Sequence, residues 1–272
     1  MKVGFVQFCP FFGNKRKNLK KIAQLIEDVE ADLLVLPELC TTGYIFKNKE
    51  ELRSLAESIP DGPTVDFFKD LANEKGINLV WGMPERDYDK VFNTSVLVTS
   101  EGEIENYRKV HLYDQEKFLF TPGDRELDVV EIKGAVLGMM ICFDWIFPEA
   151  CRVLALKDAE IICHPSNLVL QYCQPAMITR CIENRVFSIT ANRYGTEQRN
   201  QRKLTFTGKS QIVSPQGEIL ALASSDTDEV KVVEIKPELA KDKMATPNNH
   251  LLKDRRIDFY KKICKNIREG QC

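Results

Sequence analysis

Histidine is scarce in this sequence of 272 residues, which contains only His111, His164 and His250. A nucleophilic cysteine usually takes its base from histidine, and none of the three lies in a known Cys/His protease motif. His111 lies in a charged loop and His250 in a polar C-terminal segment, where a surface or supporting role is expected. His164 lies between Cys163 and Pro165 at the end of an apolar run. We expect a structural hydrogen-bonding role for it.

Metal and phosphate motifs are also missing. The sequence has no Cys-x-x-Cys or His-x-x-x-His pair, and the cysteines between Cys142 and Cys181 are roughly ten residues apart, which places them on different elements. The glycines occur singly, without a GxGxxG or GxxxxGK[ST] loop. We therefore expect no metal site and no bound cofactor.

Charge excess and long apolar runs are absent as well. Lysine and arginine total 38 against 40 aspartates and glutamates, so the formal net charge is −2 and nothing attracts nucleic acid or an anionic membrane. No apolar run is long enough to span a bilayer, and the first residues read as a strand instead of a signal peptide. We expect a cytoplasmic protein, with no nucleic-acid or membrane partner, in which most of the nine cysteines are small buried hydrophobes.

Hydrophobic residues make up 43% of the chain, which suits one domain over residues 1–272. Apolar runs and helical periodicity alternate along it. From residue 237 onward the chain is polar and then basic, and we expect a tail over 237–272 that wraps a neighbouring subunit or frays. The expected strands are 2–8, 31–39, 77–83, 92–98, 103–109, 129–132, 136–142, 159–167, 187–193, 208–214, 218–224 and 229–235, and the expected helices are 14–29, 64–75, 148–157 and 175–186.

Two segments of this pattern look alike. Residues 31–38 (ADLLVLPE) align without gaps to residues 159–166 (AEIICHPS), and both follow a helix and a short acidic turn. The match suggests a two-fold pseudo-symmetric sandwich with one such unit in each half. Strands at unrelated sheet positions would refute it.

Cys142 ends an apolar run, and a Phe-Asp-Trp turn leads from it to Pro148-Glu149, where helical periodicity begins. A thiol at such a strand-to-helix junction lies near the positive end of the helix, which favours the thiolate and lowers the thiol pKa. Cys142 is therefore a candidate nucleophile.

Such a nucleophile needs a base and an oxyanion partner. Glu38 directly follows the apolar run 31–37, where partial desolvation would raise its pKa toward that of a general base; a solvated strand-end acid is the alternative. Lys109 follows another expected strand and could be the oxyanion partner, although alone it would be taken for a surface lysine.

Several motifs in order resemble the nitrilase, or carbon-nitrogen hydrolase, superfamily over nearly the whole chain. Each motif alone is weak, and their order makes the resemblance specific. They are LPE at 36–38 with TGY at 42–44, YRKVHL at 107–112, FTPG at 120–123, CFDW at 142–145 with FPE at 147–149, and ENR at 183–185.

This resemblance implies a Glu-Lys-Cys triad made of Glu38, Lys109 and Cys142, with Glu116 as a second acid. It implies that Cys142 attacks the substrate carbon, that Glu38 is the general base and acid, and that Lys109 and the backbone amide of Phe143 form the oxyanion hole. Glu116 would orient substrate or hold Lys109. We expect the charged set to titrate as a unit, and substitution of Cys142 or Lys109 by alanine to abolish turnover while leaving the fold intact.

The resemblance also implies an α/β fold, a four-layer αββα sandwich that dimerises to αββα-αββα, so the partner expected besides substrate is a second copy or a larger homo-oligomer. Tyr44, Trp145 and Asn167 stand next to the motifs and are candidate substrate-binding residues; Trp145 could equally be core. Basic residues 193, 199, 202 and 203 are candidates for recognising an acidic substrate, with a solvated face as the alternative. Arg180 and residues 183–185 are expected to form structural ion pairs.

The function that follows is hydrolysis of a non-peptide carbon-nitrogen bond in a small amide, through a thioester and with release of ammonia or an amine. Phe143-Asp144-Trp145 differs from the Trp-Glu that follows the cysteine in typical aliphatic nitrilases. Nitrile hydrolysis is still an alternative, because the sequence also resembles archaeal-type nitrilases. N-carbamoyl-amine hydrolysis is another, because those hydrolases share the aromatic, Asp and FPE pattern after the cysteine. An idle binding or scaffold member and a thiol-redox protein are hypotheses of other classes.

Overall fold

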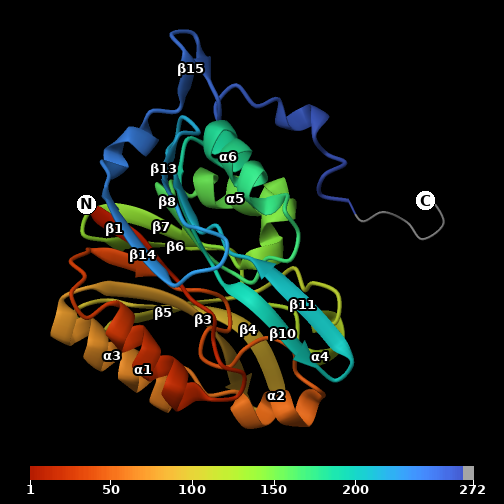
Figure 1. The fold of residues 1–272 in the computed structure, drawn as a ribbon. Coiled ribbons are helices and arrows are strands. Elements are labelled where there is room, and N and C mark those ends of the chain that lie inside the picture. Colours follow the sequence, from red (N-terminus) through yellow and green to blue (C-terminus); the bar gives the residue numbers. More distant parts are fainter. Residues whose placement is uncertain (266–272) are drawn as a thin grey trace.

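The computed structural model describes residues 1–265, so the end of the expected tail, residues 266–272, lies outside the described residues. Two six-stranded sheets face each other in the centre of the molecule, with helices on their outer sides (Figure 1). The first sheet has the order β14-β1-β2-β3-β4-β5, with bounds Glu229–Glu234, Lys2–Gln7, Leu33–Val35, Asn78–Asp87, Lys90–Val98 and Ile104–Arg108. The second has the order β13-β12-β9-β8-β7-β6, with bounds Ile219–Leu222, Gln211–Val213, Phe187–Asn192, Ile161–Ser166, Ala135–Met139 and Val129–Ile132.

The two sheets repeat one topology, which confirms the predicted pseudo-symmetry. In each sheet three central strands are parallel, β1-β2-β3 in one and β7-β8-β9 in the other, and antiparallel strands flank them. The strands of the two similar segments, β2 and β8, are the middle strands of these parallel sets. Each half is therefore one strand-helix unit built on the same plan.

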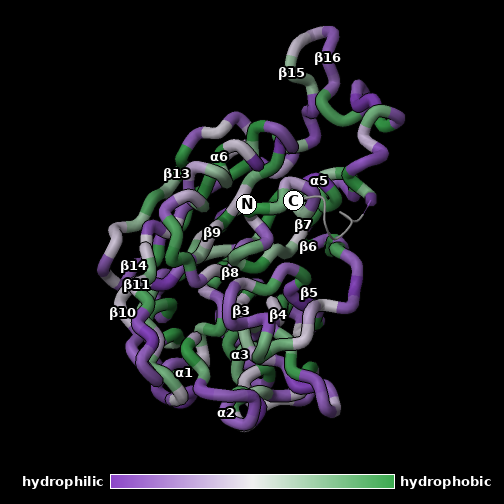
Figure 2. The backbone as a smooth tube through the Cα atoms, turned by 90° about the vertical axis from the view of Figure 1, so that its right-hand side faces the viewer, coloured by the Kyte–Doolittle hydropathy of each residue, from purple (hydrophilic) through white to green (hydrophobic). Residues whose placement is uncertain are grey.

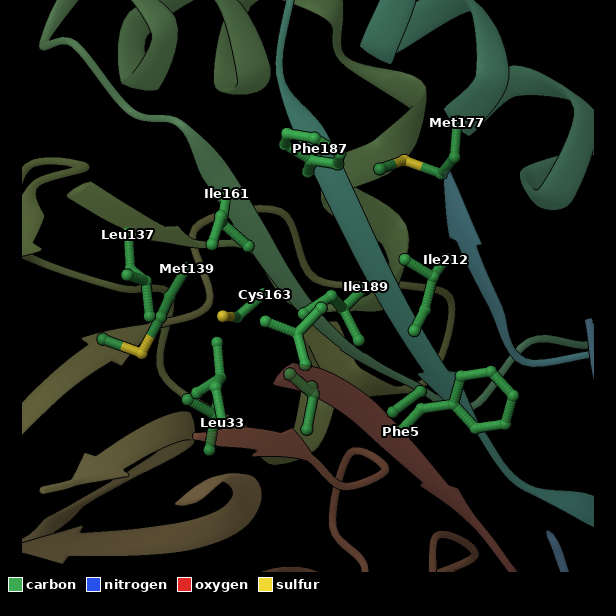
Figure 3. Packing of buried hydrophobic residues seen from close by; sticks show 14 of the residues in the cluster. Phe5, Leu33, Leu137, Met139, Ile161, Cys163, Met177, Phe187, Ile189 and Ile212 are labelled. Atoms are coloured by element: carbon green, nitrogen blue, oxygen red, sulfur yellow. The ribbon is translucent and has the colours of Figure 1, made fainter. Parts of the chain in front are cut away.

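Alternating side chains in the strands explain the layers. In β2, Leu33 and Val35 belong to the cluster between the sheets, while Leu34 packs toward the helices. In β8, Ile161 likewise faces the other sheet and Ile162 packs toward α5. Because successive strand residues point to opposite faces, an all-apolar strand needs a cover on both faces. Figure 3 shows the inner cluster, with Phe5 and Leu33 of one sheet facing Met139, Cys163 and Ile189 of the other.

Helices α1 and α3 cover the first sheet, and α5 and α6 cover the second (Figure 1). Their bounds are Lys15–Leu25, Pro63–Lys75, Pro148–Leu156 and Cys173–Asn184. Gly76 ends α3 in the left-handed conformation, as predicted. The expected helix 14–29 is shorter, because the chain turns after Ile26 to enter β2. The expected helix 175–186 begins two residues early, since a proline is tolerated in the first turn, where the helix has no partner for the amide.

The remaining elements lie outside the two sheets and, apart from the turn that follows Cys142, were not predicted. They are helices α2 (Lys49–Leu55) and α4 (Glu116–Leu119), the 3₁₀ turns η1 (Cys142–Ile146), η2 (Pro237–Lys241) and η3 (Ile257–Phe259), the hairpin β10 (Tyr194–Arg199) with β11 (Arg202–Thr207), and the small hairpin β15 (Met244–Thr246) with β16 (Asn249–His250). Four of these elements, η2, β15, β16 and η3, lie within the expected tail. Its largely hydrophilic hairpin projects from the body (Figure 2).

Candidate active site

Cys142 lies three residues beyond the end of β7 and is the first residue of η1. Its φ of +40° is in the left-handed region, which a non-glycine residue rarely adopts. The turn is held by Asp144 Oδ2, which accepts the amide of Ile141 at 2.8 Å, and by His164 Nε2, which lies 2.9 Å from the carbonyl oxygen of Cys142. A strained residue fixed in this way is a common feature of functional sites.

Glu38, Lys109 and Glu116 form one buried ion cluster. Lys109 Nζ lies 2.7 Å from Glu38 Oε1 and 2.8 Å from Glu116 Oε2, and none of the three residues is more than 3% exposed. Glu38 comes from the loop after β2, Lys109 follows β5, and Glu116 opens α4. In the sequence, Lys109 is 71 positions from Glu38 and 7 positions from Glu116, and the fold brings the three together.

The backbone around the cluster is tightly fixed. Lys109 donates its amide to Asn93 O and accepts the amide of Gly123 at its carbonyl, both at 2.8 Å. Gly82 of β3 lies against Glu38, and a Cβ on Gly82 would come within 2.5 Å of Glu38 Cα. Glycine is therefore required there by the close approach of two backbones.

Other groups complete the hydrogen bonds of the two carboxylates. Asn93 Nδ2 donates to Glu38 Oε1 at 2.7 Å, and the Tyr44 hydroxyl donates to Glu116 Oε1 at 2.7 Å. Within residues 1–265, Glu38 Oε2 is buried and has no hydrogen-bond partner. Because buried polar atoms are normally paired, this oxygen is available to accept or return a proton.

Burial sets the protonation states of the site. It raises the pKa of Glu38, which Lys109 opposes and Glu116 reinforces. Burial disfavours the charged form of Lys109, but the two carboxylates and Cys142 outweigh it and raise the pKa of the ammonium. Lys109 therefore stays charged, as a fixed cation inside the protein.

The expectation of a lowered pKa for Cys142 is wrong. Burial, with Glu38 adding to it, raises the pKa of this thiol well above its usual range, although Lys109 and the backbone amide of Asn167 oppose the shift. The helix that starts at Cys142 is one 3₁₀ turn, and α5 begins only at Pro148. The dipole effect falls off within one helical turn, so burial dominates, and the thiol is neutral until a base takes its proton.

Two of the histidines support the turn around Cys142. Burial lowers the pKa of His164 to about 4, so the ring is neutral at physiological pH. Its nitrogens bond to the Cys142 carbonyl and to Thr190, which confirms the predicted structural role. His111 Nδ1 lies 2.7 Å from Asp144 Oδ1, in agreement with a supporting role.

A small, narrow hollow opens at Cys142. Its wall is mostly apolar, and both side-chain polar atoms of Asn167 are buried without a hydrogen-bond partner in the described part of the chain. Tyr44 is not part of the wall and instead bonds to Glu116. The lining residues are Tyr113, Cys142, Phe143, Trp145, Asn167, Leu168, Val169 and Leu170. Trp145 also belongs to the inner core, so both expectations for it fit.

Three of the four basic residues expected to recognise an acidic substrate form ion pairs elsewhere, and the fourth, Lys203, is exposed. Arg193 pairs with Glu197 at 2.7 Å, Arg199 with Glu51 at 2.7 Å, and Arg202 with Asp114 at 3.4 Å. None of the three lines the hollow. These contacts give no support to recognition of an acidic substrate by the arginines.

Arg180 pairs with Glu183 at 2.9 Å and donates to the carbonyl of Trp145. The predicted structural role of this pair is confirmed.

Sequence reasoning missed Asn93 and the link made by Tyr107 and Asp144. Tyr107 donates its hydroxyl to Asp144 Oδ2 at 2.9 Å, so the strand that leads to Lys109 is tied to the turn of Cys142. Asn93 lies in β4, where it is followed by Thr94 and Ser95, and all three polar residues are buried. Successive polar residues inside an expected strand were the available signal.

Residues 1–265 contain neither a metal-binding cluster nor a helix that could span a membrane. No group of three or more His, Cys, Asp or Glu residues in this range is placed to hold a metal ion. No helix in the same range has the length and apolar character needed to cross a bilayer.

Comparison with known proteins identifies the family. Residues 2–243 match the carbon-nitrogen hydrolase family. A nitrilase from Pyrococcus abyssi is 44% identical over 96% of this chain and 99% of its own. A solved carbon-nitrogen hydrolase from Helicobacter pylori G27 is 28% identical, with a TM-score of 0.84 over 98% of both chains. A mutant amidase from Nesterenkonia sp. AN1, in which acrylamide has added to the active-site cysteine, is 25% identical, with a TM-score of 0.79 over 97% of this chain and 99% of that one.

The fold is that of the nitrilase superfamily, as predicted. The chain belongs to the carbon-nitrogen hydrolase family, and it is a hydrolase that acts on carbon-nitrogen bonds.

Proposed function

We propose that the protein hydrolyses a small uncharged amide, with Cys142 as nucleophile and a thioester as intermediate. The observation that carries this proposal is the buried Glu38–Lys109–Glu116 cluster, in which one oxygen of Glu38 is left without a partner. Both Lys109 and Glu38 influence the thiol of Cys142 electrostatically, so the four side chains share one site.

In the first half of the reaction, Glu38 accepts the thiol proton and Cys142 Sγ bonds to the carbonyl carbon. The charge that develops on the carbonyl oxygen is stabilised by Lys109 Nζ and by the amide of Phe143. Phe143 is the second residue of η1, where the helix offers its amide no acceptor. Glu38 then gives its proton to the leaving nitrogen, and the carbon-nitrogen bond breaks.

In the second half, a water molecule gives a proton to Glu38 and attacks the thioester. The carbon-sulfur bond breaks, the acid product leaves, and the proton returns from Glu38 to Cys142. The raised pKa of Glu38 suits both transfers, because it makes the carboxylate a stronger base that can hold the proton between the two steps. Glu116 holds Lys109 at the opposite side from Glu38.

The hollow indicates the kind of substrate. Its wall has aromatic and aliphatic side chains and no arginine or lysine, so it favours an uncharged acyl group. The Asn167 amide is the polar group there without a partner, and it can bond to a polar atom of the substrate. Trp145 and Tyr113 would pack against the acyl chain.

Nitrile hydrolysis is the second candidate, favoured by the 44% identity to a nitrilase. The same thiol, base and cation would serve, with two water molecules consumed in place of one. Hydrolysis of N-carbamoyl amines is less well supported, since the hollow has no charged group for the far end of such a substrate.

Ammonia release from a panel of primary amides, nitriles and N-carbamoyl compounds tests the proposal, with Cys142→Ala as control. Release from small uncharged amides that the control lacks supports it. Release only from nitriles or N-carbamoyl compounds would select the corresponding alternative. No release from any member of the panel would favour an idle binding protein.

We also propose that residues 1–272 are one domain and that the tail packs on a second copy of the chain. The tail carries apolar side chains that are more than half exposed, Ile257, Phe259 and Ile263, and it extends away from the body (Figure 1). Helices α5 and α6 expose Leu156 and Ile182 on the same side of the second sheet. Light scattering of the full chain and of a chain ending at residue 242 tests this: loss of the dimer in the short form supports it, and a monomeric full chain refutes it.

A further inference from the structure

We infer that Glu197, on the hairpin β10–β11, is a positioning residue of the active site, because it holds the loop that presents Tyr44 to Glu116. The inference rests on the proposed function, since it concerns the same catalytic lysine. Glu197 is 153 positions from Tyr44 in sequence and belongs to none of the motifs above.

Glu197 is buried, with 7% exposure, and its carboxylate is enclosed by donors. Its two oxygens accept the backbone amide of Tyr44 at 3.2 Å, and Oε1 also accepts the amide of Ile45 at 2.5 Å. Arg193 Nη1 donates to Oε2 at 2.7 Å. One carboxylate thus binds two successive amides of the loop, and charge-assisted bonds of this kind are among the strong ones.

The loop has little room to adopt another position. Gly43 has a φ of +84°, and a Cβ there would lie 2.8 Å from the Phe12 ring and 3.2 Å from Glu197 Oε2. On the other side, the Tyr44 ring meets Phe206 edge-on at 5.8 Å, and the Arg193 guanidinium lies 4.2 Å from the centre of the same Phe206 ring. The hairpin therefore fixes both the backbone and the ring of Tyr44.

Tyr44 connects the hairpin, through Glu116, to Lys109, the proposed oxyanion partner. The Tyr44 hydroxyl donates to Glu116 Oε1 at 2.7 Å, and Glu116 pairs with Lys109. If the loop shifts, Glu116 loses this donor and no longer holds Lys109 in its present position. A small displacement of a catalytic group is enough to slow the reaction by about 100-fold. Glu197 would act on catalysis through Tyr44 and without touching substrate.

The test compares Glu197→Gln, Tyr44→Phe and the double variant. Two quantities are measured, kcat/KM for amide hydrolysis and the rate at which iodoacetamide alkylates Cys142, which needs no known substrate. Glu160→Gln is the matched control. Glu160 is also a buried glutamate that accepts a backbone amide. It precedes β8, whereas the turn of Cys142 contacts His164, near the other end of that strand.

Glu197→Gln is expected to lower kcat/KM by about 10- to 100-fold, mainly through kcat, and to slow alkylation, while Glu160→Gln leaves both near the wild-type values. Because Glu197 acts through Tyr44, the double variant should be no slower than the slower single variant. Unchanged kcat in a folded Glu197→Gln protein, or losses that multiply in the double variant, would overturn the inference.

The alkylation rates separate this inference from the proposed function. If wild-type Cys142 reacts no faster than in Glu38→Gln, the proposed role of Glu38 fails, whatever Glu197 does. If Glu197→Gln does not fold, because Arg193 is left buried without its partner, the variant Arg193→Met/Glu197→Gln replaces it. The same fall in kcat is then expected, and wild-type kcat in that variant would equally refute the inference.

Discussion

Replacing Lys109 by methionine should affect both stability and turnover, and the structure gives the size of the first effect. The methionine keeps most of the side-chain volume but removes the ammonium that lies 2.7 Å from Glu38 and 2.8 Å from Glu116. Two buried carboxylates then face each other without a cation. Breaking a buried ion pair by removing one partner costs about 3–5 kcal/mol, which corresponds to a fall in Tm of about 10 °C for a chain of this size. The protein is still expected to fold, with a stability lower than that of the wild type.

The loss of stability in Lys109→Met should increase as the pH rises. Burial already raises the pKa of Glu38 in the presence of Lys109, and loss of the cation raises it further. A carboxyl whose folded pKa lies above its unfolded value keeps its proton in the folded state while the unfolded chain has released it. Stability therefore falls as the pH rises through the folded pKa. The difference in the free energy of unfolding between wild type and Lys109→Met should therefore be smaller at about pH 5.5 than at about pH 8.

Urea unfolding at these two pH values measures the difference in the free energy of unfolding, and ammonia release measures turnover. Lys109→Met/Glu116→Gln should recover part of the lost stability but no activity, because one of the opposed charges is gone and the oxyanion partner is still missing. The surface pair Lys133–Asp32 supplies the control: Lys133→Met should change stability by no more than about 0.5 kcal/mol. A deficit that is independent of pH, or wild-type turnover in Lys109→Met, would refute the reasoning.

Three further substitutions test the surroundings of the site. Glu116→Gln removes the charge that holds Lys109, and kcat should fall by about 100-fold with little change in Tm; steady-state kinetics that match the wild type would contradict this. Gly82→Ala places a Cβ 2.5 Å from Glu38 Cα, so the urea midpoint should report a loss of about 1–3 kcal/mol together with lower activity, and a wild-type midpoint would show that the contact is not tight. Asp144→Asn leaves Tyr107, His111 and the Ile141 amide with a poorer acceptor and should cost about 1–3 kcal/mol in thermal unfolding, whereas an unchanged Tm would rule out the proposed tie between the two loops.

Much of the sandwich could be predicted from the sequence, because its strands are apolar at successive positions. Residues 33–36 and 161–163 are apolar at every position, which requires cover on both faces of the sheet. The similarity of residues 31–38 and 159–166 also gave the pseudo-symmetry. The hairpin β10–β11 was not predicted, since it has few apolar residues and each strand buries only one side chain, Glu197 or Phe206. It packs by ion pairs and single aromatic contacts, which depend on residues distant in sequence.

Part of the candidate site could also be predicted, because Glu38, Lys109 and Cys142 each follow a strand and lie in recognisable motifs. The pKa of Cys142 could not, since it depends on burial beside two carboxylates that come from other parts of the chain. Glu197 was missed for a related reason: its partners are backbone amides, and no sequence pattern marks a carboxylate that binds the backbone of a distant loop.

The central claim is that Cys142 carries the acyl group during turnover. Acid quenching of the wild-type protein soon after mixing with a hydrolysed amide, followed by peptide mass spectrometry, tests this most directly. We predict an added mass equal to the acyl group on the peptide that contains Cys142, and no adduct or ammonia release with Cys142→Ala. Steady hydrolysis in Cys142→Ala, or an acyl group on a different residue, would contradict the account.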